Sequence, residues 1–181
     1  MKKTILFLSL ITITGSIFAQ PLTTTSAVVG FDATTPKDGL PKAENKAVIA
    51  SLNKTTGAVL FEAAVNNFAF ANEMIQGHFN SDKWMNSVKF PKFTFKGKIT
   101  DLSKVNFAKD GSYTVEVAGD LTVRDITKPV KTTATIVVKN GGVSTTAAFL
   151  IALTDYGISG PPIDGGKVAT EPKISVSAEF N

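Results

Sequence analysis

The sequence predicts an all-β protein: an antiparallel barrel or sandwich of about eight strands, with one or two short helices inserted near residues 73–88. Two observations predict it. Apolar and polar residues alternate along most of the chain, as they do when one face of a strand is buried and the other is wet. Strong turn signals, among them Asp110-Gly111 and Asn140-Gly141, separate the alternating runs as in consecutive hairpins.

The alternation marks individual strands from residue 47 onward. Residues 47–52 read as a short strand, and residues 58–70 as a long β-rich stretch in which Val59, Phe61 and Ala63 share one face. Five later runs alternate in the same way: residues 93–99, 113–123, 130–138, 147–153 and 174–180.

The chain before residue 47 predicts less regular structure. Residues 20–27 are polar and rich in Thr, so we expect them to fray or to start the first strand. A short apolar run follows at residues 28–31. Residues 34–45 contain Pro36, Gly39 and Pro41 together with several charges, which predicts a loop.

Residues 72–88 break the alternation and predict helical turns. Asn72 is a residue type that caps a helix starting at Glu73, and Ser81 is suited to cap a second turn over residues 82–86. We expect this insert to end before Pro91, because proline disfavours helical backbone in the residue before it.

Composition argues against most classes of enzyme. The 181 residues include no Cys and one His, His78, which excludes disulfides, thiolate metal sites and sites built from two imidazoles. Motifs of serine hydrolases, zinc proteases and phosphate-binding loops are missing. The chain has 13 Phe against one Trp and two Tyr. These numbers favour a non-enzymatic protein that binds apolar matter and needs no cofactor.

Residues 1–19 have the pattern of a secretory signal peptide. Lys2 and Lys3 form a basic start, residues 5–13 are mostly apolar, and Ala19 supplies a small residue before the expected cut. We therefore expect a periplasmic or secreted protein of residues 20–181, a single domain without a stable membrane anchor. Cleavage removes two basic residues and no acidic one, so the mature chain is close to neutral and nucleic acid is not an expected partner.

The segment around His78-Phe79-Asn80-Ser81 resembles the YceI-like family of exported, lipocalin-like, polyisoprenoid-binding proteins. That family shows His-Phe before Ser or Asn, an aromatic helical turn, and then Phe-Pro-x-x-x-Phe, which matches Phe90 to Phe95 here. Residues 119–123 with 126–130, and residues 149–158, resemble its later hairpin and last loop. The resemblance covers about residues 57–181.

The resemblance implies a lipocalin-like barrel that encloses a long isoprenoid chain, such as that of a prenyl quinone or polyprenyl phosphate. By position it assigns the following residues to the wall: Phe79, Trp84, Met85, Phe93 and Phe95. The alternation and the proximity in sequence add further apolar candidates: Phe68, Phe70, Met74, Tyr113, Val115 and Ile151. An all-apolar wall can discriminate ligands by length and width but not by hydrogen bonds, so we expect poor selectivity among apolar ligands.

Two polar candidates and three functions stay open. His78 is expected either to contact a polar head group or to satisfy backbone groups of the helical insert, and Tyr156 to close the opposite end of the barrel. The favoured function is binding, sequestration or transport of an isoprenoid or other long apolar lipid. The alternatives are a structural or interaction barrel with a filled core and, least favoured, an isomerase that acts on a bound lipid. A homodimer also stays open.

Overall fold

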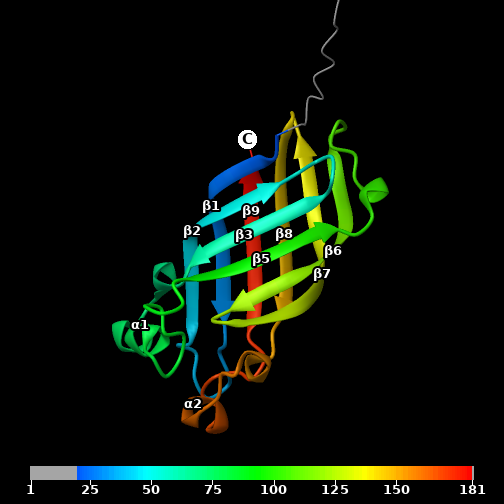
Figure 1. The fold of residues 1–181 in the computed structure, drawn as a ribbon. Helices are drawn as coiled ribbons and strands as arrows, with labels where there is room; N and C mark the ends of the chain where they lie inside the picture. The colour runs from blue at the N-terminus through cyan, green and yellow to red at the C-terminus, as the bar shows by residue number, and fades with distance from the viewer. Residues whose placement is uncertain (1–19, 181) are drawn as a thin grey trace, which may run out of the picture.

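In the computed structural model, which describes residues 20–180, the alternating segments form one antiparallel sheet that closes on itself (Figure 1). The strands are β1 (Leu22–Asp32), β2 (Lys42–Leu52), β3 (Ala58–Ala64), β4 (Ala69–Phe70), β5 (Lys92–Ile99), β6 (Gly111–Val123), β7 (Ile126–Lys139), β8 (Gly142–Leu150) and β9 (Lys173–Phe180). Two α-helices, α1 (Glu73–Asn80) and α2 (Pro161–Asp164), and three 3-10 turns, η1 (Val65–Asn67), η2 (Leu102–Lys104) and η3 (Leu153–Tyr156), connect them. The predicted signal peptide lies outside the described residues.

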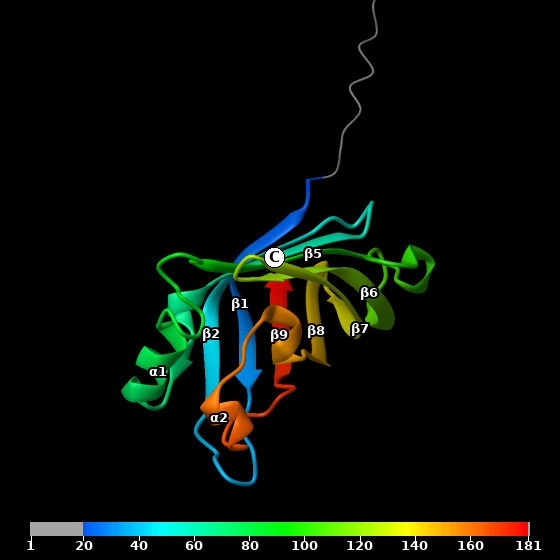
Figure 2. The same cartoon turned by 60° about the horizontal axis from the view of Figure 1, so that its bottom comes forward.

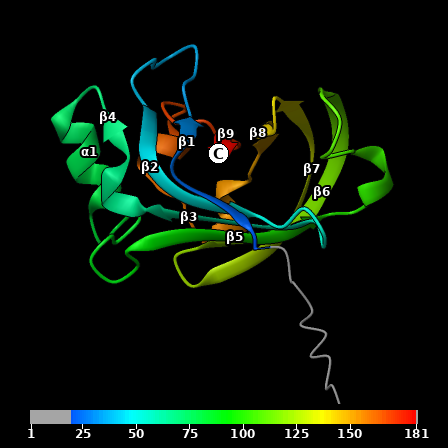
Figure 3. The same cartoon turned by 90° about the horizontal axis from the view of Figure 1, so that it is seen from above.

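Eight strands make the closed barrel, in the order β1-β9-β8-β7-β6-β5-β3-β2, and β2 returns to pair with β1. Figure 3 shows the strands arranged around a common centre, with β1 and β2 on the side away from β6 and β7. The predicted Asn140-Gly141 turn joins β7 to β8, and both residues have positive φ, 51° and 81°, as a two-residue hairpin turn requires. The expected barrel of about eight antiparallel strands is confirmed.

Strand β2 pairs with two different partners along one edge, and a buried amide bridges the gap between them. Its first residues pair with β4 and its last four with β3. Asn45 lies between these parts and is fully buried. Its Nδ2 donates to the carbonyl oxygen of Ala64 (2.9 Å), and its Oδ1 accepts from the backbone N–H of Ala47 (3.0 Å). The side chain thus supplies the hydrogen bonds that the interrupted ladder lacks.

The structure defines two boundaries that the pattern left open and corrects a third. Residues 20–27 start the first strand, which was one of the two expected outcomes: β1 begins at Leu22 and pairs with β2 across two irregularities in register. The loop expected at residues 34–45 ends at Pro41, since β2 starts at Lys42. The β-rich stretch 58–70 is divided into two strands, because η1 turns the chain between β3 and β4.

Of the one or two helices expected near residues 73–88, the structure has one, α1. Asn72 Oδ1 accepts from the backbone N–H groups of Met74 (2.9 Å) and Ile75 (3.2 Å), so the expected cap of α1 is present. Residues 82–85 form hydrogen-bonded turns, so the second helical turn suggested for residues 82–86 is not a helix. Ser81 does not cap them with its side chain, because its Oγ donates to the carbonyl of His78 (2.7 Å) instead. Neither α1 nor α2 is long and apolar enough to cross a bilayer.

Both helices lie at one end of the barrel, which we call the helical end (Figures 1 and 2). The β1–β2 loop and the segment around α2 are tied together there. Thr35 Oγ1 donates to the carbonyl of Gly166 (2.8 Å), Lys37 Nζ donates to that of Gly165 (3.1 Å), and the Ala169 N–H bonds to the carbonyl of Ala33 (2.9 Å). These hydrogen bonds hold the β1–β2 loop and the α2 segment together as one side of the helical end.

We expect Asn45→Ala to lower the free energy of unfolding by about 1–3 kcal/mol, because it removes the two hydrogen bonds that this fully buried side chain makes with the Ala64 carbonyl and the Ala47 N–H. Urea denaturation followed by circular dichroism measures the change. Asn106→Ala is the matched control, since Asn106 is exposed and its Oδ1 also accepts from a backbone N–H two residues on (2.9 Å). Equal losses in the two variants would contradict the bridging role of Asn45.

Candidate functional site: an apolar cavity and its mouth

The inner faces of the strands enclose an elongated cavity. It offers about 150 Å³ to the centre of a water-sized sphere, so it is narrow. Ile174, Val176 and Phe180 all line it from β9, which gives a length of roughly 20 Å along that strand at about 3.3 Å per residue. Among the described residues the wall has three polar side chains, those of Thr94, Thr132 and Thr145, and is otherwise apolar. The barrel interior is therefore not completely filled.

Large rings line this space without blocking it, because glycines let one of them lie against the wall. Gly97 on β5 pairs with Gly119 on β6. The ring of Phe95 lies over this pair: a Cβ placed on Gly97 would stand 2.7 Å from its Cζ, and one on Gly119 would stand 2.8 Å from it. Side chains at either position would push the ring away from the sheet. Because Gly97 and Gly119 have no side chains, the Phe95 ring can lie against the sheet.

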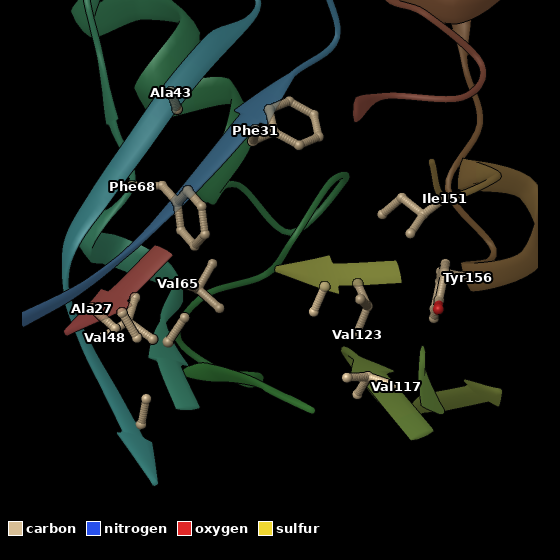
Figure 4. Packing of buried hydrophobic residues seen from close by; sticks show 14 of the residues in the cluster. Ala27, Phe31, Ala43, Val48, Val65, Phe68, Val117, Val123, Ile151 and Tyr156 are labelled. Atoms are coloured by element: carbon tan, nitrogen blue, oxygen red, sulfur yellow. The ribbon is translucent and has the colours of Figure 1, made fainter. Parts of the chain in front are cut away.

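A cluster of phenylalanine rings lies where the cavity meets the helical end. Phe79, the one buried residue of α1, stands at its centre, with ring centroids 4.9 Å from Phe70, 6.0 Å from Phe31 and 6.0 Å from Phe68. Figure 4 shows Phe31 and Phe68 on one side of the interior and Ile151 with Tyr156 across from them. Tilted contacts of this kind are each worth about 0.5–1.5 kcal/mol beyond simple burial. The cluster docks α1 onto the barrel.

A second and wider pocket opens outside this cluster, which we call the mouth pocket. It offers about 580 Å³ on the same measure and lies between α1, the turns after it, the β1–β2 loop and the α2 segment. Phe31 and Phe79 line both the mouth pocket and the cavity, so the two spaces share one boundary. Its charged and polar lining comes from Asp38, His78, Ser81, Lys83, Ser159 and Lys167. A narrow apolar tube therefore ends in a wider, partly charged opening.

The structure brings nine of the thirteen predicted binding residues to these two spaces. Phe68, Phe79, Met85, Phe93, Phe95 and Ile151 line the cavity, and Phe70, His78 and Trp84 line the mouth pocket, which Phe79 shares. His78 is exposed on α1. That any of them contacts a ligand stays a prediction.

Four predicted residues lie away from both spaces. Met74 is 70% exposed on the outer face of α1. Tyr113 lies near the start of β6, where its hydroxyl donates to the carbonyl of Lys109 (2.9 Å), and Val115 is buried in the core. Tyr156 was expected to close the opposite end, but η3 directly follows β8 at the helical end (Figure 1).

Sequence reasoning named too few wall residues. Phe61 and Phe149 line the cavity, and so do the small side chains of Ala63, Ala134 and Ala147, which leave room for it. The signal was present in the alternation, since Phe61 shares a face with Val59 and Ala63, and Phe149 with Ala147 and Ile151. Lys83 and Lys167 carried no such signal, because the fold alone brings them to one pocket.

The chemistry that this arrangement offers is burial of an apolar chain. Within residues 20–180 no three His, Asp or Glu side chains gather as a metal site would require. Burial raises the pKa of the Tyr156 phenol to about 12, with a smaller contribution from the Asp155 carboxylate, so this group stays neutral at physiological pH. The Tyr156 side chain is buried in the core and lines neither of the two spaces.

Comparisons with known proteins agree with this architecture. The model of the family described as YceI-like domain matches residues 19–180. A polyisoprenoid binding domain from Saccharophagus degradans, implicated in plant cell wall breakdown, superposes with a TM-score of 0.73 at 14% identity, over 89% of this chain and 97% of that one. BcnA from Burkholderia cenocepacia gives 0.69 at 16% identity, over 86% and 96%. The Campylobacter jejuni YCEI protein gives 0.54 at 14% identity, over 100% and 99%. None of the curated proteins matches the sequence.

We expect Gly119→Ala to lower the free energy of unfolding by about 1–3 kcal/mol, because the new Cβ would clash with Gly97 Cα and the Lys96 carbonyl oxygen and would displace the Phe95 ring. Thermal and urea denaturation measure the loss. Gly77→Ala is the control: no atom lies within 4 Å of its Cβ position on α1, so it should be neutral or stabilise by up to about 1 kcal/mol. A Gly119→Ala variant as stable as the wild type would refute the close packing.

Tyr156 predicts a loss of stability in alkaline solution. Its pKa is raised to about 12 in the folded protein, against about 10 in an unfolded chain. The stability that it contributes is complete below pH 10 and disappears as the pH rises towards 12, by roughly 2–3 kcal/mol. Unfolding free energies at pH 9 and pH 11.5 should therefore differ less in Tyr156→Phe than in the wild type. A Tyr156→Phe variant that keeps the full difference of the wild type would contradict this argument.

Proposed function

Because the chain belongs to the YceI-like domain family, we propose that it binds one long apolar lipid in the barrel and carries or sequesters it without chemical change. The lipid class that we propose is an isoprenoid, such as a prenyl quinone or a polyprenyl phosphate. One observation carries the proposal: an elongated, almost wholly apolar cavity that ends in a wider mouth pocket.

The physical basis is the transfer of a hydrocarbon chain out of water. Each Å² of apolar surface that the barrel covers contributes about 25 cal/mol, so a chain lying along the length of β9 is held without hydrogen bonds. A narrow tube of aliphatic and aromatic side chains suits a thin ligand. A broad, rigid ligand would have to displace rings such as Phe61 and Phe95.

Two observations other than the shape of the cavity support an isoprenoid as the bound lipid. The structural neighbour from Saccharophagus degradans is described as a polyisoprenoid binding domain. The same ligand class follows from the residues that resemble the family, of which Phe79, Met85, Phe93 and Phe95 line the cavity of this chain. We place the protein in the periplasm or outside the cell, on the pattern of residues 1–19.

The rival function, a barrel with a filled core, is disfavoured by the same cavity. In a filled barrel the inward rings would be buried by one another. Here Phe61, Phe93, Phe95 and Phe149 face the interior and are nevertheless only partly buried, because they border open space.

The proposal is tested by filling the tube from one wall. Ala147→Phe places a ring in the cavity, because Ala147 lines it from β8 and pairs with Ala134, another wall residue. The neighbouring Ala148→Phe is the matched control, since Ala148 is exposed on the outer face of the same strand. Native mass spectrometry of freshly purified protein should show a lipid adduct in the wild type and in Ala148→Phe, and at least a tenfold smaller fraction in Ala147→Phe.

Circular dichroism and thermal denaturation establish whether both variants are folded. Thr145→Leu places a smaller side chain in the same cavity and replaces Ala147→Phe if that variant does not fold. Wild-type protein that neither copurifies with lipid nor takes up an added prenyl quinone or prenyl phosphate would overturn the proposal. So would undiminished lipid in a folded Ala147→Phe variant.

A further inference from the structure

We propose that the mouth pocket holds the head group of the bound lipid and that its two lysines select an anionic head, such as a phosphate, over a neutral one. This inference rests on the proposed function, because it requires the apolar chain to lie in the barrel. The pocket borders the cavity through Phe31 and Phe79, so a chain in the tube ends at this opening.

The positive charge comes from two separate segments. Lys83 stands in the turns after α1, and Lys167 follows α2. Within residues 20–180, the ion pairs involve other lysines, namely Lys42, Lys46, Lys92 and Lys131. The ammonium groups of Lys83 and Lys167 are therefore not neutralised by a carboxylate within ion-pair distance, and both remain available to a ligand.

One carboxylate shares the pocket, and it is partly engaged. Asp38 Oδ1 accepts from the backbone N–H of Leu40 (2.8 Å), which closes a tight turn in the β1–β2 loop. His78 adds a ring nitrogen that can donate to an oxygen atom, and Ser159 adds a hydroxyl. Two full positive charges thus face one negative charge. This balance favours a phosphate or carboxylate oxygen over the carbonyl of a quinone.

The size of the effect follows from the exposure of the two side chains. Both lysines are exposed, and an exposed ion pair usually changes an equilibrium constant by a factor of about two to five. Two such pairs predict a preference of roughly tenfold for an anionic head at low ionic strength. The preference should shrink as salt is added, because exposed charges are screened.

The test compares two ligands that share one chain. Farnesyl phosphate and farnesol are titrated into the mature protein at low salt, and Trp84, the single tryptophan, reports binding from the mouth pocket by fluorescence. Calorimetry provides a second measurement. We expect the wild type to bind farnesyl phosphate about ten times more tightly than farnesol. Lys83→Gln/Lys167→Gln should reduce this ratio to about one while leaving the affinity for farnesol unchanged.

The control removes the same charge elsewhere. Lys54, in the β2–β3 hairpin, and Lys139, at the end of β7, lie away from the helical end, so Lys54→Gln/Lys139→Gln should keep the tenfold ratio. An equal drop in both double variants would overturn the proposal, because the effect would then come from net charge. Inorganic phosphate should leave the fluorescence of Trp84 unchanged at the concentration at which farnesyl phosphate saturates the protein. An equal fluorescence change with inorganic phosphate would show that the pocket binds free phosphate and would overturn the lipid head group as its ligand.

Failure of the inference and failure of the proposed function give different results. Wild-type protein that binds farnesol and farnesyl phosphate equally overturns the head-group selection and leaves the lipid-binding barrel intact. Wild-type protein that binds neither ligand overturns both.

Discussion

The closed hydrogen-bond ladder decides what each side chain on the eight strands can do. Because β2 pairs with β1 as well as with β3, the sheet has a definite inside and outside. Successive residues then alternate between the enclosed space and the solvent. Ala147 and Ala148 show the result most simply: they are neighbours of identical chemistry, yet one lines the cavity and the other is exposed.

Closure alone would produce a packed core, so the open space needs a further explanation. It comes from small residues on the inner wall and from the way the rings are held. Gly97 and Gly119 allow Phe95 to lie on the sheet, while Ala63, Ala134 and Ala147 occupy positions that larger residues would fill. The volume left over is narrow and almost without hydrogen-bonding groups. Polar groups gather instead at the mouth pocket, so the apolar and the polar surfaces are separated in space.

Features that depend on neighbouring residues in the sequence could be predicted, and features that depend on the closed fold could not. The alternation at residues 93–99, the turn at Asn140-Gly141 and the Asn72 cap are local, and the structure contains all three. The division of residues 58–70 into β3, η1 and β4 depends on which part of β2 each piece meets. No local pattern contains that information.

The same limit explains the predictions for the site. Phe93 and Phe95 were assigned by the resemblance to the family, and both line the cavity. Tyr113 and Val115 were chosen from the alternation, which does not say how far along the barrel a residue lies, and both are away from the cavity. Met74 was chosen for its apolar character, although one turn of α1 exposes it. Lys83 and Lys167 are far apart in sequence, and the mouth pocket exists only once α1 and α2 lie at the same end.

The position of the last strand has a consequence for how the chain reaches its folded state. β9 lies between β8 and β1, and Val28 near the amino end pairs with Ser177 near the carboxyl end. The ring of strands cannot be completed until the carboxyl-terminal segment has left the ribosome, and contacts so distant in sequence form slowly. The barrel therefore closes only after the whole described chain has been synthesised, although local hairpins such as β6–β7 do not depend on this last strand.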